Sequence, residues 1–107
     1  MQIIFKIGKT MNQTGIKSEV IEEIRNIARK YNVEKVILFG SRARGDYSRI
    51  SDIDLAIHGG DITRFSIEVD EETSTLLMYD FVNLDTDVQK ELLESINREG
   101  VVLYEKV

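Results

Sequence analysis

The chain has 107 residues, enough for one globular domain with a core but too few for the separate subdomains of a templated polymerase. Hydrophobic residues make up 42% of it, and 14 basic against 19 acidic side chains leave a formal net charge of −5. This acidic balance disfavours binding to nucleic acid, which requires basic side chains against phosphate. No cysteine is present, so disulfides and thiolate metal sites are excluded.

Residues 1–17 carry the least regular pattern, and we interpret them as an N-terminal extension with some flexibility. Their apolar run is interrupted by Lys6 and is too short for a signal-peptide core or a membrane span. One hypothesis is that the first ten residues are a disordered extension or follow a misplaced start, because Met11 precedes the regular part. We expect one domain over residues 18–107, in a cytoplasmic protein without membrane contact.

Residues 18–31 are predicted to form an amphipathic helix. Their apolar side chains recur on one face, and basic residues near the end suit the helix dipole. Ser18 is the expected cap. A buried strand over residues 36–39 follows.

The strand ends at Gly40-Ser41, which predicts a sharp turn into a short helix over residues 42–45. Glycine lets the backbone approach a ligand closely, and free backbone amides at a helix start can hold an anion. Gly40 and Ser41 are therefore candidate phosphate-binding residues. Taken alone, a Gly-Ser pair is more often only a turn.

A second predicted strand, over residues 52–57, carries Asp52 and Asp54. The two-residue period of a strand places both carboxylates on one face, while Ile53 and Leu55 point into the core. Two carboxylates side by side are suited to a divalent metal ion. An isolated Asp-x-Asp of this kind can also be simple solvation of an exposed face.

The remaining elements complete an α/β pattern. Residues 61–74 fit a helix or a strand; Asp61 as a possible cap favours the helix, and so does the family resemblance described below. A strand over residues 76–84 contains Asp80, a charged residue that requires a partner. Residues 85–87 are predicted to cap a last helix, and a final strand covers residues 101–104. We expect a small mixed sheet with helices packed mainly on one face.

Gly40-Ser41 followed by Asp52-Ile53-Asp54 resembles the signature of the DNA polymerase β-like nucleotidyltransferase superfamily, most closely its minimal nucleotidyltransferase domain. The resemblance implies that Asp80 is a third carboxylate, which binds the catalytic metal and helps to deprotonate an acceptor hydroxyl. It also implies that Mg²⁺ is the cofactor, with two ions expected when nucleotide is bound.

The same resemblance implies that ATP is the substrate and that AMP is transferred to a hydroxyl. Arg42 is the arginine expected to stabilise the triphosphate, ahead of Arg44 and Arg49. In simpler interpretations these arginines are surface charge and Asp80 is a structural carboxylate. The single histidine, His58, is interpreted as a surface residue, and Tyr47 as a loop residue that contacts either the base or nothing.

Proteins similar to this one include the MntA-type antitoxins, whose partners are HEPN-domain ribonuclease toxins. The resemblance therefore implies adenylylation of a partner toxin at a tyrosine hydroxyl. A homo- or hetero-oligomer is a further expectation. Two alternatives stay open at this point. One is a non-catalytic module that binds the toxin, and the other is a small-molecule nucleotidyltransferase of the antibiotic-modifying kind.

Overall fold

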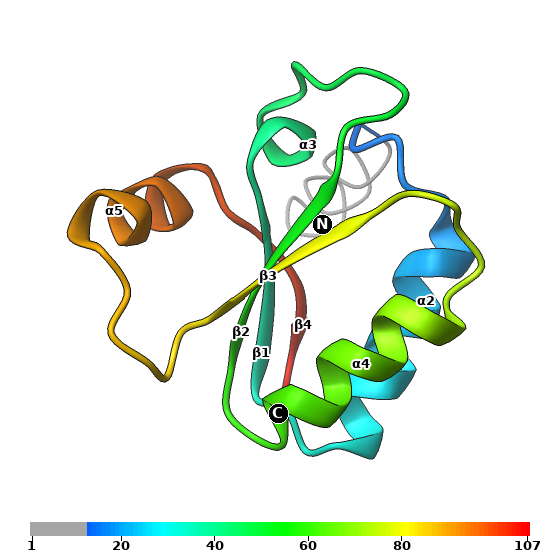
Figure 1. Ribbon diagram of the computed structural model, residues 1–107, viewed down its shortest axis with the longest axis vertical. Coiled ribbons are helices and arrows are strands. Elements are labelled where there is room, and N and C mark those ends of the chain that lie inside the picture. The colour runs from blue at the N-terminus through cyan, green and yellow to red at the C-terminus, as the bar shows by residue number, and fades with distance from the viewer. Residues whose placement is uncertain (1–12) are drawn as a thin grey trace.

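The computed structural model describes residues 13–107, which form one four-stranded sheet with helices on both faces (Figure 1). The strands are β1 (Lys35–Phe39), β2 (Ile53–His58), β3 (Tyr79–Asn83) and β4 (Val101–Glu105). Their order in the sheet is β3-β2-β1-β4. Strand β1 runs antiparallel to β2 and β4, whereas β2 and β3 are parallel. The predicted mixed sheet is confirmed.

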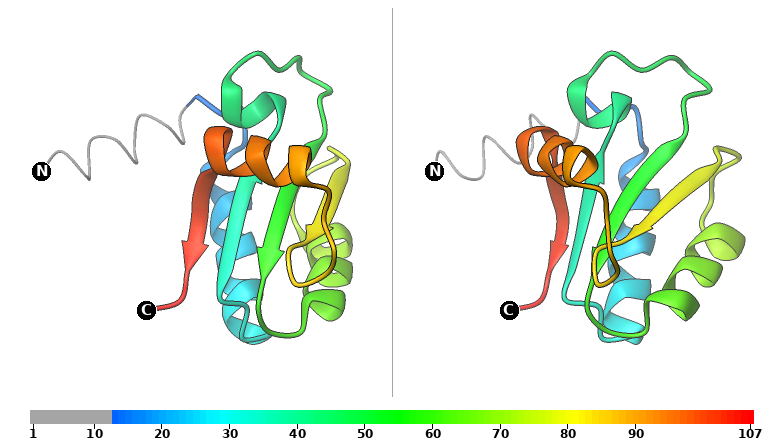
Figure 2. Two further views of the ribbon diagram at one scale, coloured as in Figure 1. Left: turned by 90° about the vertical axis from the view of Figure 1, so that its left-hand side faces the viewer. Right: turned by 60° about the vertical axis from the view of Figure 1, so that its left-hand side comes forward.

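The two longest helices pack against each other on one face of the sheet. These are α2 (Ser18–Lys30) and α4 (Ile62–Glu72). Helix α5 (Lys90–Glu99) lies on the opposite side, where Ile96 is buried (Figures 1 and 2). The single turn α3 (Ser41–Arg44) follows β1 directly. The predicted α/β fold is thus confirmed, with most of the helical surface on one face.

Side chains of β2 alternate between these two layers. Ile53, Leu55 and Ile57 are fully buried in the main core with α2 and α4. Ala56 belongs to the smaller core on the α5 side. Because alternate residues of a strand share a face, Asp54 lies on the same side as Ala56, away from the main core.

Two helix starts test the predicted caps. Asp61 does cap α4, since its carboxylate accepts a hydrogen bond from the backbone N–H of Arg64 at 3.2 Å. Ser18, in contrast, is the first helical residue, and Lys17 occupies the cap position without a side-chain hydrogen bond. The prediction that Ser18 caps α2 is therefore wrong.

The prediction that residues 85–87 cap α5 is also wrong. The helix begins later, with Gln89 at its cap position and no side-chain hydrogen bond there. The Asp85 carboxylate instead accepts a hydrogen bond from the backbone N–H of Gly59 at 2.9 Å and lies 2.6 Å from Nδ1 of His58. A tertiary contact has replaced the local one.

At the N-terminal side, the hypothesis about the first ten residues lies outside the described part of the chain. Thr14 and Ile16 are buried, and Ile16 joins the main core, so residues immediately before α2 pack on the domain. Among residues 13–107, no helix is both long and apolar enough to cross a membrane.

Candidate active site

Two of the predicted carboxylates are direct neighbours across the parallel strands. Asp54 of β2 is the register partner of Asp80 of β3. Tyr79 and Phe81, on either side of Asp80, pack against the main core, so Asp80 lies on the other face of the sheet, the face of Asp54. Asp52 is two residues before Asp54, and its charge acts on the Asp54 carboxylate. The structure therefore places the three acidic residues on one face of the sheet, at the same end of β2 and β3, and we call them the carboxylate cluster.

The electrostatics of this cluster centre on Asp54, which is partly buried while Asp52 and Asp80 are exposed. The pKa of Asp54 is raised above its ordinary value of 3.8, first because burial disfavours the charged form. The negative charges of Asp80 and Asp52 raise it further, and the positive charge of Arg44 opposes them. Among the charges that act on Asp54, Arg44 is thus the one positive charge against two negative ones.

Gly40 brings the turn after β1 against this cluster. Phe39 is the register partner of Asp54, so the next residue, Gly40, lies at the same end of the strand pair. A Cβ at position 40 would collide with Oδ2 of Asp54, and the backbone φ of +77° is one that only glycine adopts without strain. The sequence suggested that phosphate lies close to the backbone of Gly40; in the structure the Asp54 carboxylate lies there.

Ser41 begins α3 beside the same turn, and it is half-buried. The N–H groups of Ala43 and Arg44 donate to the carbonyl of Gly40, at 3.1 and 3.0 Å, which closes the single turn. Ser41 is thereby held at the end of β1, next to the strand that carries Asp54. Its role in phosphate binding stays a prediction.

Arg42 has partners that the sequence did not suggest. It is only 2% exposed, and its guanidinium stacks over the ring of Tyr47 at 4.7 Å. It donates hydrogen bonds to four backbone carbonyls, those of Thr14 (2.9 Å), Ser51 (3.0 Å), Arg49 (3.3 Å) and Ser48 (3.4 Å). In this arrangement Arg42 holds the loop that leads to Asp52, and its predicted contact with the triphosphate would require these bonds to break.

Arg44 is the arginine whose charge reaches the carboxylates. It is exposed and pairs with Asp46 at 3.2 Å and Glu99 at 3.1 Å, and it lowers the pKa of Asp54. From the sequence, Arg42 was the arginine expected at the triphosphate, ahead of Arg44. Helical spacing contained the missed signal, because Ser41 and Arg44, three residues apart, share a face of α3 whereas Arg42 is rotated away.

His58 lies outside this site, as the sequence analysis expected. It is the last residue of β2, four residues beyond Asp54, or about 13 Å along a strand. It is exposed and pairs with Asp85. Because that contact and the N–H of Gly59 favour the charged form, the pKa of Asp85 is lowered.

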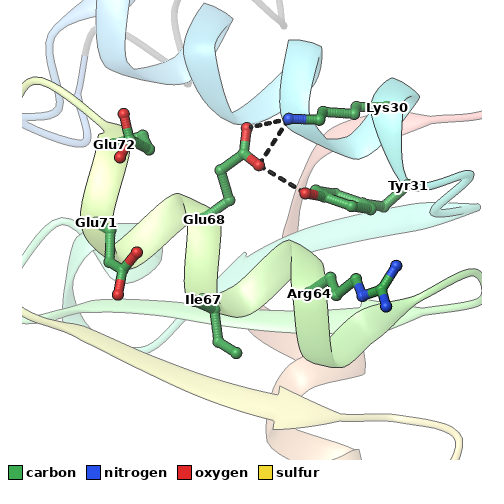
Figure 3. A pocket seen from close by; sticks show the side chains of 7 residues that line it. All are labelled: Lys30, Tyr31, Arg64, Ile67, Glu68, Glu71 and Glu72. Carbon is green, nitrogen blue, oxygen red and sulfur yellow. Dashed lines mark hydrogen bonds and ion pairs between the residues drawn. The ribbon is translucent and has the colours of Figure 1, made fainter.

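A separate pocket of about 310 Å³ opens between α2 and α4 (Figure 3). In it Glu68 accepts hydrogen bonds from Lys30 at 2.8 Å and from the Tyr31 hydroxyl at 2.6 Å, and both lower the pKa of Glu68. None of the three clustered carboxylates lines this pocket. As the side chains stand in residues 13–107, no three His, Asp or Glu residues are close enough together to hold a metal ion.

The family model described as "Polymerase beta, Nucleotidyltransferase" matches residues 22–107. The chain belongs to this nucleotidyltransferase family. A protein of Methanocaldococcus jannaschii named "Putative protein adenylyltransferase MJ0604" is 36% identical over 106 residues, covering 88% of this chain and 100% of that protein.

Two solved structures share the fold of this nucleotidyltransferase. One is a toxin-antitoxin with AMP-PNP, with a TM-score of 0.64 and 23% identity; the other is a mutant of the toxin-antitoxin MntA-HpeT, with 0.63 and 21%. Each match covers 80% of this chain and 73% of the other chain. At such identities the likeness concerns the fold. Together with the family match, it confirms the nucleotidyltransferase fold.

Proposed function

We propose that this nucleotidyltransferase moves AMP from ATP to a tyrosine hydroxyl of a HEPN-type ribonuclease toxin and so acts as its antitoxin in the cytoplasm. The proposal rests on one observation above all, the pairing of Asp54 with Asp80 beside the Gly40-Ser41 turn. It is supported by the relative whose name is a protein adenylyltransferase and by the fold shared with toxin-antitoxin structures.

The carboxylate cluster fits a divalent cation. Mg²⁺ is usually held by one or two protein carboxylates together with substrate phosphates, so three preassembled ligands are not required. The raised pKa of Asp54 reflects the negative charge of Asp52 and Asp80, which a cation would neutralise. When bound to these three residues, Mg²⁺ would supply charge stabilisation for the entering and leaving oxygens.

In the proposed reaction, the acceptor oxygen forms a bond to the α-phosphorus of ATP. The bond from that phosphorus to the bridging oxygen breaks, and pyrophosphate leaves with the electron pair. The hydroxyl proton passes to the Asp80 carboxylate, which is exposed at the edge of the sheet. Ser41 and Arg44 are the groups we assign to the triphosphate, since both belong to α3 beside the cluster.

The test incubates the chain with Mg²⁺, ATP labelled at the α-phosphate, and the protein encoded by the neighbouring open reading frame. We expect label on a tyrosine of that protein, located by mass spectrometry, and none from ATP labelled at the γ-phosphate. Absence of transfer with all four nucleoside triphosphates would overturn the proposal. An Asp52→Ala, Asp54→Ala double variant that still neutralises the toxin would instead favour the non-catalytic binding module.

A further inference from the structure

Three large apolar side chains stand exposed where the chain enters β2 and β3. Ile50 is 83% exposed, Met78 is 67% exposed, and Leu76 is exposed as fully as in an extended chain, at 102%. Because β2 and β3 are parallel, the loops before them lie at the same end of the sheet (Figures 1 and 2). This is also the end that carries the carboxylate cluster.

Alternation along the segment before β3 places Met78 on the carboxylate face. Leu77 and Tyr79 both pack against the main core, so the residue between them points to the other side. Asp80 follows Met78 by two residues and shares that side, about 7 Å further along the chain. An exposed apolar side chain therefore lies next to the acidic residue proposed to receive the acceptor proton.

The order of the sheet determines the side from which an acceptor can approach. Gly40 and Ser41 follow β1, on one side of Asp54, so the triphosphate is assigned to that side. Asp80 lies on the other side, in β3, and within residues 13–107 no strand pairs with the outer edge of β3. The acceptor then reaches the α-phosphate over β3, where it meets Met78.

We propose that Leu76 and Met78 form an acceptor-docking surface, with Ile50 at the same end of the sheet, which binds a polypeptide segment carrying apolar side chains beside its tyrosine. The inference rests on the proposed function and states how the protein partner is recognised. Exposed apolar side chains suit an apolar segment, and flexible Met adapts to its shape. The net charge of −5 and the adjacent carboxylates disfavour a nucleic acid on this surface. The free edge of β3 offers backbone groups to an extended segment.

The experiment records amide spectra of the ¹⁵N-labelled chain with Mg²⁺ and α,β-methylene-ATP while a peptide is added. One peptide has Leu on both sides of its Tyr, and the matched peptide has Ser there. We expect the Leu peptide to shift the amides of residues 76–80. It should also bind at least about 10-fold more tightly than the Ser peptide, a difference of about 1.4 kcal/mol in binding free energy.

Leu76→Ser and Met78→Ser should remove most of this preference without unfolding the chain, because both side chains are already exposed. Ile67→Ser is the matched control: Ile67 is 53% exposed but lies on α4, on the main-core side of the sheet, and lines the pocket there (Figure 3). It should leave the preference intact. Dispersed spectra for all three variants establish that each is folded.

Equal binding of the two peptides, no binding of either, or shifts confined to other residues would overturn the docking surface. The nucleotide alone tests the proposed function separately, through shifts at residues 40–44 and 52–54. Loss of those shifts would count against nucleotide transfer itself. With nucleotide binding and labelled transfer intact, a missing peptide preference would overturn only the docking surface.

Discussion

At the scale of single residues, Gly40 joins the turn after β1 to the carboxylate cluster. Gly40→Ala introduces a Cβ into the space of the Asp54 carboxylate and strains a backbone with φ of +77°. We expect a loss of about 2–3 kcal/mol in the free energy of unfolding and a severe loss of nucleotide transfer. Gly45→Ala is the control, because φ there is +95° but no atom lies within 4 Å of the added Cβ. If Gly40→Ala and Gly45→Ala lose the same free energy of unfolding in urea denaturation, the contact with Asp54 is not the cause.

The raised pKa of Asp54 predicts a pH-dependent cost in the metal-free protein. Its ionisation destabilises the folded state above the folded pKa, and this cost disappears as the pH falls below the ordinary value of 3.8. Asp54→Asn should therefore raise the free energy of unfolding near neutral pH, with the gain shrinking in acid. Nucleotide transfer should fall by more than about 100-fold, because mutating even the outer-shell partners of metal ligands typically lowers metal affinity or activity 10–100-fold. Urea denaturation in EDTA, near neutral pH and again below pH 3.8, measures the difference in unfolding free energy between variant and parent. A variant less stable than the parent near neutrality would contradict the prediction.

Arg42 is a structural requirement for the loop that leads to Asp52. Arg42→Ala leaves the buried carbonyl of Thr14 and the partly buried carbonyl of Ser51 without their donor, and should lower the free energy of unfolding by about 3 kcal/mol or more. Arg42→Lys should recover little, because an ammonium cannot reproduce the planar fork. Arg49→Ala, at an exposed position in the same loop, should change stability by less than about 0.5 kcal/mol. Chemical denaturation distinguishes these variants, and a stable Arg42→Ala would leave the arginine available for the triphosphate.

The residues of the cluster were predictable to different degrees. Strand alternation alone places Asp52 and Asp54 on one face. The position of Asp80 depends on the register between β2 and β3, which are separated in sequence by α4, so only the family resemblance indicated it. The burial of Arg42 depends on carbonyls from a loop and from the segment before α2, and no local pattern encodes such contacts.

At the scale of elements, sequence patterns predicted every helix and strand of residues 18–107 within a few residues, although periodicity alone left residues 61–74 open between a helix and a strand. The errors lie at ends where a tertiary contact replaces a local one, as at Asp85, which binds Gly59 instead of capping α5. The strand predicted over residues 76–84 is shorter, at Tyr79–Asn83. Its first residues, Leu76 and Met78 among them, are exposed and precede the pairing with β2.

Helix α5 provides the test at this scale, because among the elements of residues 13–107 it is the long helix on the face that carries Asp54 (Figure 2). Ile96 is 2% exposed and packs with Phe39 and Ala56 in the smaller core. Ile96→Ala should cost about 2–4 kcal/mol of unfolding free energy. Leu93→Ala, on the same helix but 37% exposed, should cost less than about 1 kcal/mol. Similar urea midpoints for the two variants would show that α5 contributes little to the stability of the sheet.

At the scale of the whole molecule, the sheet order places three parts of the candidate site side by side. The turn after β1, the Asp-x-Asp at the start of β2 and Asp80 on β3 are successive across the sheet. The main core behind them is formed by α2 and α4 together with the inward-facing side chains of the strands, and none of the three carboxylates belongs to it. Because the buried residues of the main core include none of the three carboxylates, variants in the cluster should alter ligand binding more than folding.

Ligand binding can be measured through the stability of the intact chain. A nonhydrolysable ATP with Mg²⁺, at about 100 times its Kd, should stabilise the folded state by about 2.7 kcal/mol, a rise in Tm of roughly 10 °C or more for a domain of this size. Removing Mg²⁺ with EDTA should abolish most of this rise, because the triphosphate would then face Asp52, Asp54 and Asp80 without a cation between them. Asp52→Asn should leave the Tm without ligand unchanged or slightly higher, because it removes a negative charge that acts on Asp54, and it should lose the rise with ligand. Thermal unfolding that gives the same rise with and without Mg²⁺ would place nucleotide binding away from the carboxylates.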